Sequence, residues 1–269
     1  MVVFPNAKIN LGLNVVNKRD DGLHDIETVF YPIQFKEVLE VLPINSDKCS
    51  FSSTGVEIPK SEDGNLVLQA YNILAKDFKM PNFDFRLHKL IPIGAGLGGG
   101  SADASFTIIA LNKSCNLGLS LIEMEFYASK LGSDCPFFIR NEPVYATGKG
   151  DDFHEVDCSL KGKYLLLINP NIHISTATAY SGVIPQSKNE KIPEILKLPI
   201  DQWKDNLVND FETSVFSIYP DLSEVKDQLY LKGAVYASMS GSGSSMFGLF
   251  NEKPNTAGLD HYSCWILPF

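Results

Sequence analysis

The feature that most constrains this chain is a glycine-rich segment at residues 91–105, IPIGAGLGGGSADAS. Its five glycines fall within seven positions, at Gly94, Gly96, Gly98, Gly99 and Gly100. Because glycine lacks a Cβ, such residues adopt positive φ and turn successive backbone N–H groups toward one point. Ser101 follows as the expected N-cap of a helix over residues 102–110, whose positive end favours the same anion. The segment therefore predicts a phosphate-binding loop.

The flanking sequence favours an ordered loop between a strand and a helix over a flexible linker. The alternating run FDFRLH at 83–88 is typical of a strand, and SFTIIAL at 105–111 is typical of a helix. A linker would have polar flanks. The GxGxxG match at 94–99 lacks the downstream carboxylate of a dinucleotide site, so nicotinamide binding is disfavoured. The chain also lacks a Walker A lysine and the HRD and DFG motifs of protein kinases.

Composition limits the class of protein and its partners. With 269 residues and 44% hydrophobic content, the chain has the size of one large or two ordinary globular domains. Its net charge of −9 opposes nonspecific attraction to nucleic acid and to anionic membranes. It shows no long apolar run and no signal-peptide pattern, so we expect a cytoplasmic protein. Five cysteines without a CxxC pair disfavour a disulfide framework or a zinc site.

Periodicity predicts alternating strands and helices, which favours an α+β architecture over a doubly wound parallel sheet. Strands are expected within 2–16 and 27–42, and at 83–88, 164–168, 234–239, 245–250 and 262–267. Helices are expected at 65–78, 102–110, about 120–132, from about 175, and at 206–218 and 221–232. Asn65 is the expected cap of the first helix, and Ser120 with Glu123 forms a capping box. A new unit begins with the apolar strand at 164–168, which places a domain boundary near residue 156.

Three segments together resemble the GHMP kinases, named for galacto-, homoserine, mevalonate and phosphomevalonate kinases. PIGAGLGGGSADAS at 92–105 resembles the second family motif, AKINLGLNV at 7–15 the first, and SMSGSGSSMFGLF at 238–250 the third. The resemblance implies a two-domain α+β fold. Residues 1–156 would form a ribosomal protein S5-like nucleotide-binding domain, and residues 157–269 a ferredoxin-like α/β substrate-binding domain. It also implies ATP and Mg²⁺ as cofactors.

The resemblance assigns the nucleotide phosphates to one continuous run of residues. These are Pro92, Ile93, Gly94, Ala95, Gly96, Leu97, Gly98, Gly99, Gly100, Ser101 and Ala102. The hydroxyl of Ser101 is a candidate ligand of the phosphates or of Mg²⁺, and no other metal ligand is expected. Mg²⁺ keeps several waters, so few protein ligands are needed.

The catalytic pair implied by the resemblance is Asp134, in GSDCPFF at 132–138, with Lys8. A lysine within about 4–6 Å lowers the pKa of an aspartate by roughly 1–3 units and keeps it ionised. We therefore expect Asp134 to orient the acceptor hydroxyl and to accept its proton late in the transfer. Without the resemblance, Asp134 would be interpreted as a cap or turn residue before Pro136, and Lys8 as an exposed strand lysine.

Within the family, DDGLHDIETVF at 20–30 and GSDCPFF most resemble kinases of a cytidine diphosphate alcohol in non-mevalonate isoprenoid synthesis. The substrate residues so implied are Asn10 near the acceptor, His24 and Tyr180 at the cytosine base, Thr176, and Gly241 with Ser242 at the substrate phosphates. Leu23 stands where the family often has a second aromatic ring, so the usual two-ring sandwich lacks one ring.

Several interpretations remain open from sequence. The acceptor is another alcohol, such as homoserine or mevalonate, in one alternative; the chain is an inactive nucleotide-binding module in a second; and a nicotinamide oxidoreductase is the third. The chain is expected to be a monomer or a weak homodimer without nucleic-acid or membrane partners. The polar run at 187–191 is expected to be a solvated loop, and NDFE at 209–212 has no derivable role beyond Phe211 in the core.

Overall fold

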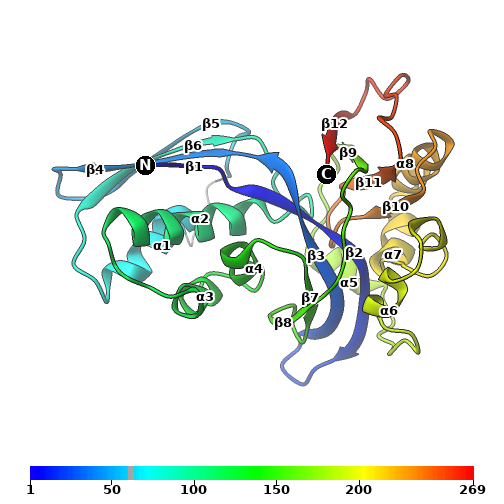
Figure 1. Ribbon diagram of the computed structural model, residues 1–269, viewed down its shortest axis with the longest axis horizontal. Coiled ribbons are helices and arrows are strands. Elements are labelled where there is room, and N and C mark those ends of the chain that lie inside the picture. The colour runs from blue at the N-terminus through cyan, green and yellow to red at the C-terminus, as the bar shows by residue number, and fades with distance from the viewer. Residues whose placement is uncertain (60–63) are drawn as a thin grey trace. The chain divides into compact units, whose positions relative to one another are not determined.

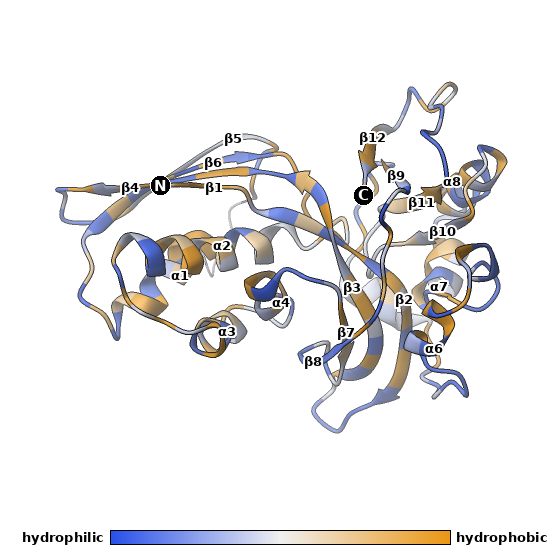
Figure 2. Ribbon diagram, in the orientation of Figure 1, coloured by the Kyte–Doolittle hydropathy of each residue, from blue (hydrophilic) through white to orange (hydrophobic). Residues whose placement is uncertain are grey.

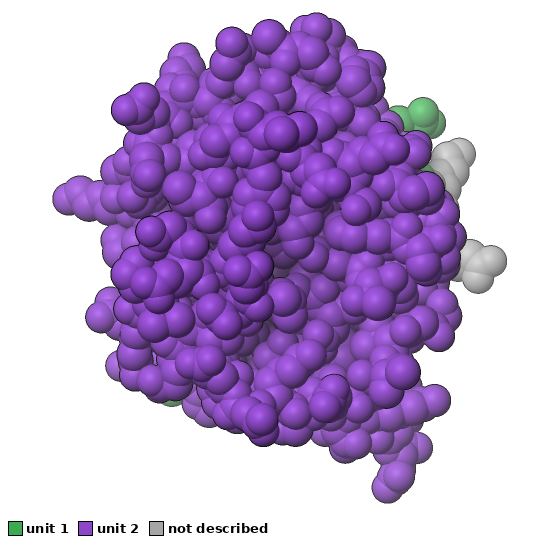
Figure 3. Space-filling view, turned by 90° about the vertical axis from the view of Figure 1, so that its right-hand side faces the viewer, with its two compact units in different colours: residues 1–7, 35–93, 98–142 green, residues 8–34, 94–97, 143–269 purple. Residues whose placement is uncertain are grey.

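The computed structural model describes residues 1–59 and 64–269, which fold into two compact units (Figure 1). Unit 1 comprises residues 1–7, 35–93 and 98–142, and unit 2 comprises residues 8–34, 94–97 and 143–269; Figure 3 colours these residues and shows a face of unit 2. The units therefore interleave along the chain. The division expected from the sequence, into a nucleotide-binding domain at 1–156 and a substrate-binding domain at 157–269, stays a prediction.

Unit 1 contains one four-stranded sheet in the order β1-β4-β6-β5. Its strands are β1 (Val2–Val3), β4 (Val38–Ile44), β6 (Asn82–Lys89) and β5 (Ser50–Gly55). Only β5 runs parallel to its partner β6 within this sheet of the described residues. In β6 the alternation predicted from FDFRLH puts Phe83, Phe85 and Leu87 on the buried face. The alternation of apolar and polar residues thus fixes which face of β6, the strand before the glycine loop, is buried.

Four helices pack on one face of this sheet (Figure 1). They are α1 (Leu66–Ala75), α2 (Gly99–Ser114), α3 (Leu121–Ser129) and α4 (Cys135–Arg140). The predicted cap of α1 is confirmed, because the Asn65 side chain accepts a hydrogen bond from Val67 N at 2.8 Å. The capping box of Ser120 and Glu123 is also confirmed. The short helix α4 was not expected, although Pro136 in its first turn is a typical helix-start signal.

Unit 2 contains two four-stranded sheets, in the orders β2-β3-β7-β8 and β10-β11-β9-β12. The first comprises β2 (Asn6–Lys18), β3 (His24–Lys36), β7 (Val144–Thr147) and β8 (Asp152–Glu155), with the first two residues of β2 and the last two of β3 in unit 1. The second comprises β10 (Tyr236–Met239), β11 (Met246–Phe250), β9 (Tyr164–Asn169) and β12 (Ser263–Pro268) and is antiparallel throughout. The charged loop between β2 and β3 is hydrophilic in Figure 2.

The helices of unit 2 lie between β9 and β10 in the chain. They are α5 (Thr176–Ser181), α6 (Ile192–Leu196), the 3₁₀ turn η1 (Ile200–Gln202), α7 (Phe211–Ile218) and α8 (Pro220–Leu231). Phe211, Val215 and Val225 are buried in the core with the strands of the second sheet. The helix predicted from residue 206 begins only at Phe211. Residues 208–210 pair with β2 instead, through Leu13 N to Val208 O at 2.9 Å and Asp210 N to Leu13 O at 2.8 Å.

Antiparallel pairing and segregated helices confirm the α+β prediction. Residues 186–202, where no helix is expected from the sequence, contain α6 because Ile192, Ile195 and Leu196 are buried. Within the described residues, each helix is too short or too polar to cross a bilayer.

Candidate active site

The glycine loop before α2 alternates anchored and turning residues. Gly94, Gly96 and Gly98 have φ of 69°, 79° and 72°, where a side chain is unfavourable. Ala95 and Leu97 between them are 3% and 1% exposed. The buried methyl and isobutyl groups hold the loop in place, while the glycines leave its backbone unobstructed.

The N-terminus of α2 differs from the prediction. Gly98, in the left-handed conformation, is the N-cap, and its carbonyl accepts a hydrogen bond from Ala102 N at 2.9 Å. The prediction that Ser101 caps the helix is therefore wrong: glycine's tolerance of positive φ lets the helix start earlier, and Ser101 lies in its first turn. The N–H groups of Gly99, Gly100 and Ser101 consequently have no partner within α2, as at any helix start. The first turn carries no acidic side chain to oppose an anion.

Within unit 2, this loop lies directly against the serine-rich loop at 240–244. A Cβ on Gly96 would lie 1.9 Å from Ser240 O, and one on Gly243 would lie 2.1 Å from Gly96 N. Ser240 Oγ donates to Gly96 O at 3.0 Å, and Ser245 N donates to Ala95 O at 3.2 Å. The glycines of both loops are thus required by close backbone approach, and the second and third sequence motifs meet here.

The first motif joins them through β2. Lys8 N donates to Leu97 O at 3.0 Å, and Lys8 Nζ donates to Asn10 Oδ1 at 2.7 Å. Asn10 Nδ2 donates in turn to Thr28 Oγ1 at 2.9 Å. Lys8 is 4% exposed, so the interpretation as an exposed strand lysine is wrong. A Cβ on Gly241 would lie 3.4 Å from Lys8 Nζ and 3.3 Å from Asn10 Oδ1, which places this ammonium group beside the serine-rich loop.

Asp134 belongs to unit 1, at the N-cap position of α4. Its side chain makes no capping hydrogen bond to α4, a helix that the structure describes in full, so the role of a simple cap does not fit. Ser105 Oγ donates to Cys135 O at 2.6 Å and ties the start of α4 to α2. Burial raises the pKa of Cys135 to about 11, which favours a protonated filler over a nucleophile. Because Lys8 belongs to unit 2, its pairing with Asp134 stays a prediction.

A buried charged triad, not anticipated from the sequence, lies at the base of the glycine loop. Lys89 Nζ donates to Glu37 Oε1 at 2.6 Å and to Asp103 Oδ2 at 2.7 Å. Their side chains are 3%, 0% and 6% exposed. Leu90 N donates to Glu37 Oε2 at 2.9 Å, so the triad fixes the chain just before the loop. A Cβ on Gly99 would lie 3.0 Å from Lys89 Nζ, which shows how close the triad is to the start of α2.

Two carboxylates share one ammonium in this triad, which we call the Lys89 triad. Burial raises the pKa of Asp103 to about 7, and Lys89 opposes that shift. Burial also raises the pKa of Glu37. In the described part of the chain, Asp103 Oδ1 is buried without a hydrogen-bond partner. The position of Lys89 at the end of an alternating strand gave no sign of this burial, because charged residues are rarely buried unless paired.

Of the residues predicted to bind the cytosine base, the structure brings two together within unit 2. The rings of His24 and Tyr180 stack with centroids 4.5 Å apart and an interplanar angle of 23°. Tyr180 also packs edge-on against Phe211 at 4.7 Å. Thr176 is the exposed first residue of α5, and Leu23 is 50% exposed. In this structure the two aromatic residues therefore contact each other through their faces.

The segment NDFE at 209–212 contacts both β2 and the serine-rich loop with the strand before it, β10. Phe211 is 2% exposed, which confirms it as core. Asn209 donates to Gly241 O at 2.9 Å, and Glu212 accepts from Met239 N at 2.8 Å. The run at 187–191 is a loop, as expected, but Lys188 forms an ion pair with Asp210 at 3.0 Å and Lys191 another with Glu27. Among the described residues, no group of three His, Cys, Asp or Glu side chains is arranged to hold a metal.

Comparison with known proteins bears on this geometry. Residues 65–142 match the model of the GHMP kinases N-terminal domain, and residues 192–258 match that of the GHMP kinases C-terminal domain. A relative from Parabacteroides distasonis named 4-diphosphocytidyl-2-C-methyl-D-erythritol kinase is 52% identical over 254 residues, covering 94% of this chain and 93% of its own. The chain belongs to the GHMP kinase family. A relative from Bacteroides fragilis with the same name is 48% identical, covering 97% of this chain and 96% of its own.

Solved structures agree with this family assignment. The crystal structure of a 4-(cytidine 5'-diphospho)-2C-methyl-D-erythritol kinase is similar with a TM-score of 0.81 at 27% identity, covering 100% of both chains. The mevalonate kinase of Methanococcus jannaschii has a TM-score of 0.72 at 14% identity, over 100% of this chain and 98% of that one, and so shares the fold. The predicted GHMP kinase fold is confirmed. As a GHMP kinase, the chain is an ATP-using phosphotransferase with a small-molecule substrate.

Proposed function

We propose that this GHMP kinase transfers the γ-phosphoryl group of ATP to the 2-hydroxyl of 4-diphosphocytidyl-2-C-methyl-D-erythritol. The products are the 2-phosphate and ADP, in the non-mevalonate route to isoprenoid precursors. The observation that carries this proposal is the set of relatives named for this substrate, 48–52% identical over 93% or more of both chains. The similar mevalonate and homoserine kinase structures are 13–19% identical and support the fold alone.

The phosphates of ATP are assigned to residues 92–102. Positive φ at alternate glycines, N–H groups without a partner inside α2 and the positive helix end suit a polyanion. Ser101, in the first turn of that helix, would offer its hydroxyl to the phosphates or to Mg²⁺. When bound, Mg²⁺ supplies charge neutralisation between the phosphate oxygens.

Lys8 and Asp134 are assigned the catalytic roles. Phosphoryl transfer depends mainly on position and electrostatics, so a fixed ammonium near the transferring group lowers the barrier. Lys8 is suited to this because it is buried and its Nζ is oriented by Asn10 at 2.7 Å. Asp134 would orient the acceptor hydroxyl and take up its proton as the bond to phosphorus forms.

The cytidine diphosphate alcohol is assigned to Asn10, His24, Thr176, Tyr180, Gly241 and Ser242. A base stacked on Tyr180 contributes about 1–3 kcal/mol, as for bases on aromatic platforms generally. That stacking requires the ring of His24 to separate from Tyr180, because the two rings are in contact at 4.5 Å. His24 is then free to hydrogen-bond the edge of the base. Leu23, half exposed, supplies apolar surface rather than a second ring.

The acceptor assay tests this function. The purified protein is incubated with ATP, Mg²⁺ and, separately, the cytidine diphosphate alcohol, homoserine or mevalonate, while ADP release and the ³¹P spectrum of the product are followed. We expect turnover of the cytidine compound alone, with a new phosphomonoester signal. Turnover of homoserine or mevalonate without turnover of the cytidine compound contradicts the proposal.

We further propose that the protein acts in the cytoplasm as a monomer or weak homodimer without nucleic-acid partners, in keeping with its net charge of −9. Sedimentation velocity over a range of protein concentrations measures the oligomeric state, and a stable higher oligomer contradicts this part.

A further inference from the structure

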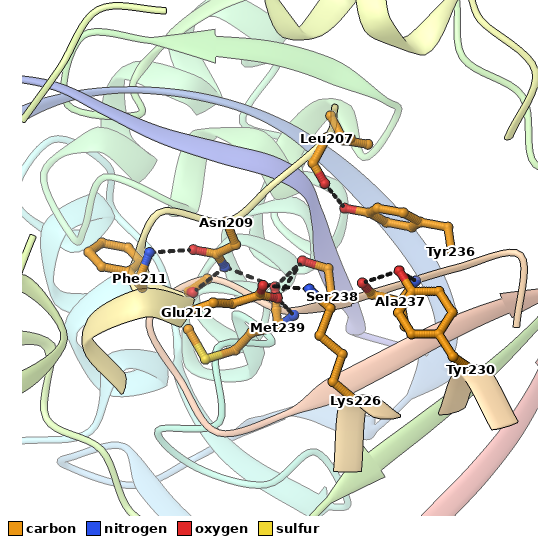
Figure 4. Close-up of polar contacts among 11 residues, drawn as sticks. Leu207, Asn209, Phe211, Glu212, Lys226, Tyr230, Tyr236, Ala237, Ser238 and Met239 are labelled. Atoms are coloured by element: carbon orange, nitrogen blue, oxygen red, sulfur yellow. Dashed lines mark hydrogen bonds and ion pairs between the residues drawn. The ribbon is translucent and has the colours of Figure 1, made fainter. Parts of the chain in front are cut away.

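The NDFE segment at 209–212 makes buried hydrogen bonds through its first and last residues, Asn209 and Glu212. In Asn209 both the amide N–H₂ and the amide oxygen are hydrogen-bonded. Asn209, 2% exposed, donates through Nδ2 to Met239 O and to Gly241 O, both at 2.9 Å (Figure 4). Its Oδ1 accepts from Phe211 N at 3.0 Å. Two donors and one acceptor are therefore required at this side chain, and only an amide of this shape supplies them.

Glu212 holds the neighbouring end of β10. Its Oε1 accepts from Met239 N at 2.8 Å and from Ser238 Oγ at 3.1 Å. Its Oε2 accepts from Lys226 Nζ at 2.6 Å, which neutralises the carboxylate (Figure 4). Asn209 and Glu212 thus fix, from one short segment, the last residues of β10 and the first turn of the serine-rich loop.

The same segment is attached to the strand that carries Lys8. Leu13 pairs with residues 208–210 through two backbone hydrogen bonds, and Val15 N donates to Asp210 Oδ2 at 2.9 Å. Further along β2, Lys8 and Asn10 face Gly241, whose φ is +59°. The Gly241 carbonyl therefore accepts a hydrogen bond from Asn209, and a Cβ on the same residue would lie 3.4 Å from the Lys8 ammonium.

We infer that Asn209 is a positioning residue for phosphoryl transfer: it fixes the Gly241 backbone against Lys8 and Asn10, and Glu212 secures the adjoining strand end. This inference rests on the proposed function, because the proposed function supplies the phosphoryl transfer in which Asn209 is given a role. Asn209 does not itself touch the reacting groups. It acts by setting the space beside the Lys8 ammonium, and misplacement by about 1 Å near reacting groups costs on the order of 10²-fold in rate.

The decisive variant is Asn209→Asp, which keeps the shape but replaces both donors with an oxygen facing two carbonyls. We expect kcat to fall about 10²-fold at pH 8. Only the protonated form of the introduced carboxyl donates a hydrogen bond, so the ratio of variant to wild-type kcat should rise as the pH falls from 8 to 6. Asn206→Asp, at an exposed position three residues away, makes the same charge change and should keep wild-type kcat at each pH.

The outcomes separate the two proposals. A wild-type protein that does not turn over the cytidine compound overturns the proposed function and, with it, the reaction assigned to Asn209. An active wild type with Asn209→Asp equal to Asn206→Asp, or with a kcat ratio that does not change with pH, overturns the positioning role alone. If Asn209→Asp is unfolded at the assay temperature, Asn209→Ser decides: it donates one hydrogen bond instead of two, and kcat within twofold of wild type overturns the role.

Discussion

The glycine loop at 92–102 and the serine-rich loop at 240–244 each follow a segment whose backbone donates a hydrogen bond to a carboxylate paired with a lysine. We call each of these charged groups the support of its loop. The two supports differ in net charge. In unit 1, Glu37 and Asp103 share Lys89, and the three side chains are at most 6% exposed. In unit 2, Glu212 pairs with Lys226, and these side chains are 11% and 21% exposed. The first support has an excess of buried negative charge, and the second is balanced and partly hydrated.

This difference predicts which change each support is most sensitive to. An excess buried carboxylate is stabilised by taking up a proton, and burial raises the pKa of Asp103 to about 7. The stability of the charged group at the glycine loop should therefore depend on pH and strongly on its lysine, Lys89. The support of the serine-rich loop uses one cation for one anion and adds the neutral amide of Asn209, so its function should depend on hydrogen-bond geometry.

Removal of the cation should give the largest difference between the two supports. Lys89→Met leaves two buried carboxylates unpaired and should lower the free energy of unfolding by about 3–5 kcal/mol at pH 8. Lys226→Met leaves one partly hydrated carboxylate and should cost about 1–2 kcal/mol. Urea denaturation measures both. Equal losses would show that the two supports do not differ as described.

The second prediction concerns pH. The pKa of Asp103 is raised above its unfolded value of about 3.9, so the folded state binds the proton more tightly and its contribution to stability is lost as the pH rises toward 7. The free energy of unfolding of the wild type, relative to Asp103→Asn, should fall by up to about 4 kcal/mol between pH 4 and pH 8. A constant difference across this range contradicts the excess-charge account.

The third prediction tests the contact between the loops. In Gly96→Ala, φ of +79° and a Cβ 1.9 Å from Ser240 O force the backbones apart, so we expect a loss of about 1–3 kcal/mol and a higher KM for ATP. Gly118→Ala is the matched control, since its φ is also positive, at +72°, but a Cβ there would meet no described atom within 4 Å. Thermal unfolding and initial rates report both, and a harmless Gly96→Ala would refute the close approach.

The smallest effect is expected from the removal of a single side-chain hydrogen bond between the loops. Ser240→Ala removes the 3.0 Å bond to Gly96 O and should cost about 0.5–1.5 kcal/mol in the free energy of unfolding. Ser217→Ala, in which the lost bond joins residues of one helix, serves as the comparison in the same denaturation experiment. A loss above about 3 kcal/mol would mean that Ser240 does more than join the loops.

Much of the fold was predictable because its signals are local. Alternation placed β6, Asn65 and Ser120 marked two helix starts, and the glycine run marked the loop before α2. The exact start of α2 was misjudged because serine usually outranks glycine as a cap, whereas the left-handed Gly98 fits this turn. The start of α7 was misjudged because residues 208–210 pair with β2, about 200 positions earlier in the chain.

The supports beneath the loops were not predictable for the same reason. Lys89 meets Glu37 across 52 positions, and Asn209 meets Gly241 across 32. No periodic pattern marks a buried ion pair or a buried amide, since charge and polarity usually indicate an exposed face. Family resemblance supplied Lys8 and Asp134, and the burial of Lys8 in the structure is consistent with an assigned role.

The central claim is that the loop at 92–102 holds the ATP phosphates and directs the terminal one to an alcohol beside Lys8 and Asp134. A crystal structure with a nonhydrolysable ATP analogue and the cytidine diphosphate alcohol tests it most directly. The account predicts phosphate oxygens within hydrogen-bond distance of the N–H groups of residues 99–101, with the 2-hydroxyl in reach of the Asp134 carboxylate and Lys8 near the γ-phosphate. Phosphates bound away from this loop, or an acceptor hydroxyl remote from both side chains, would contradict it.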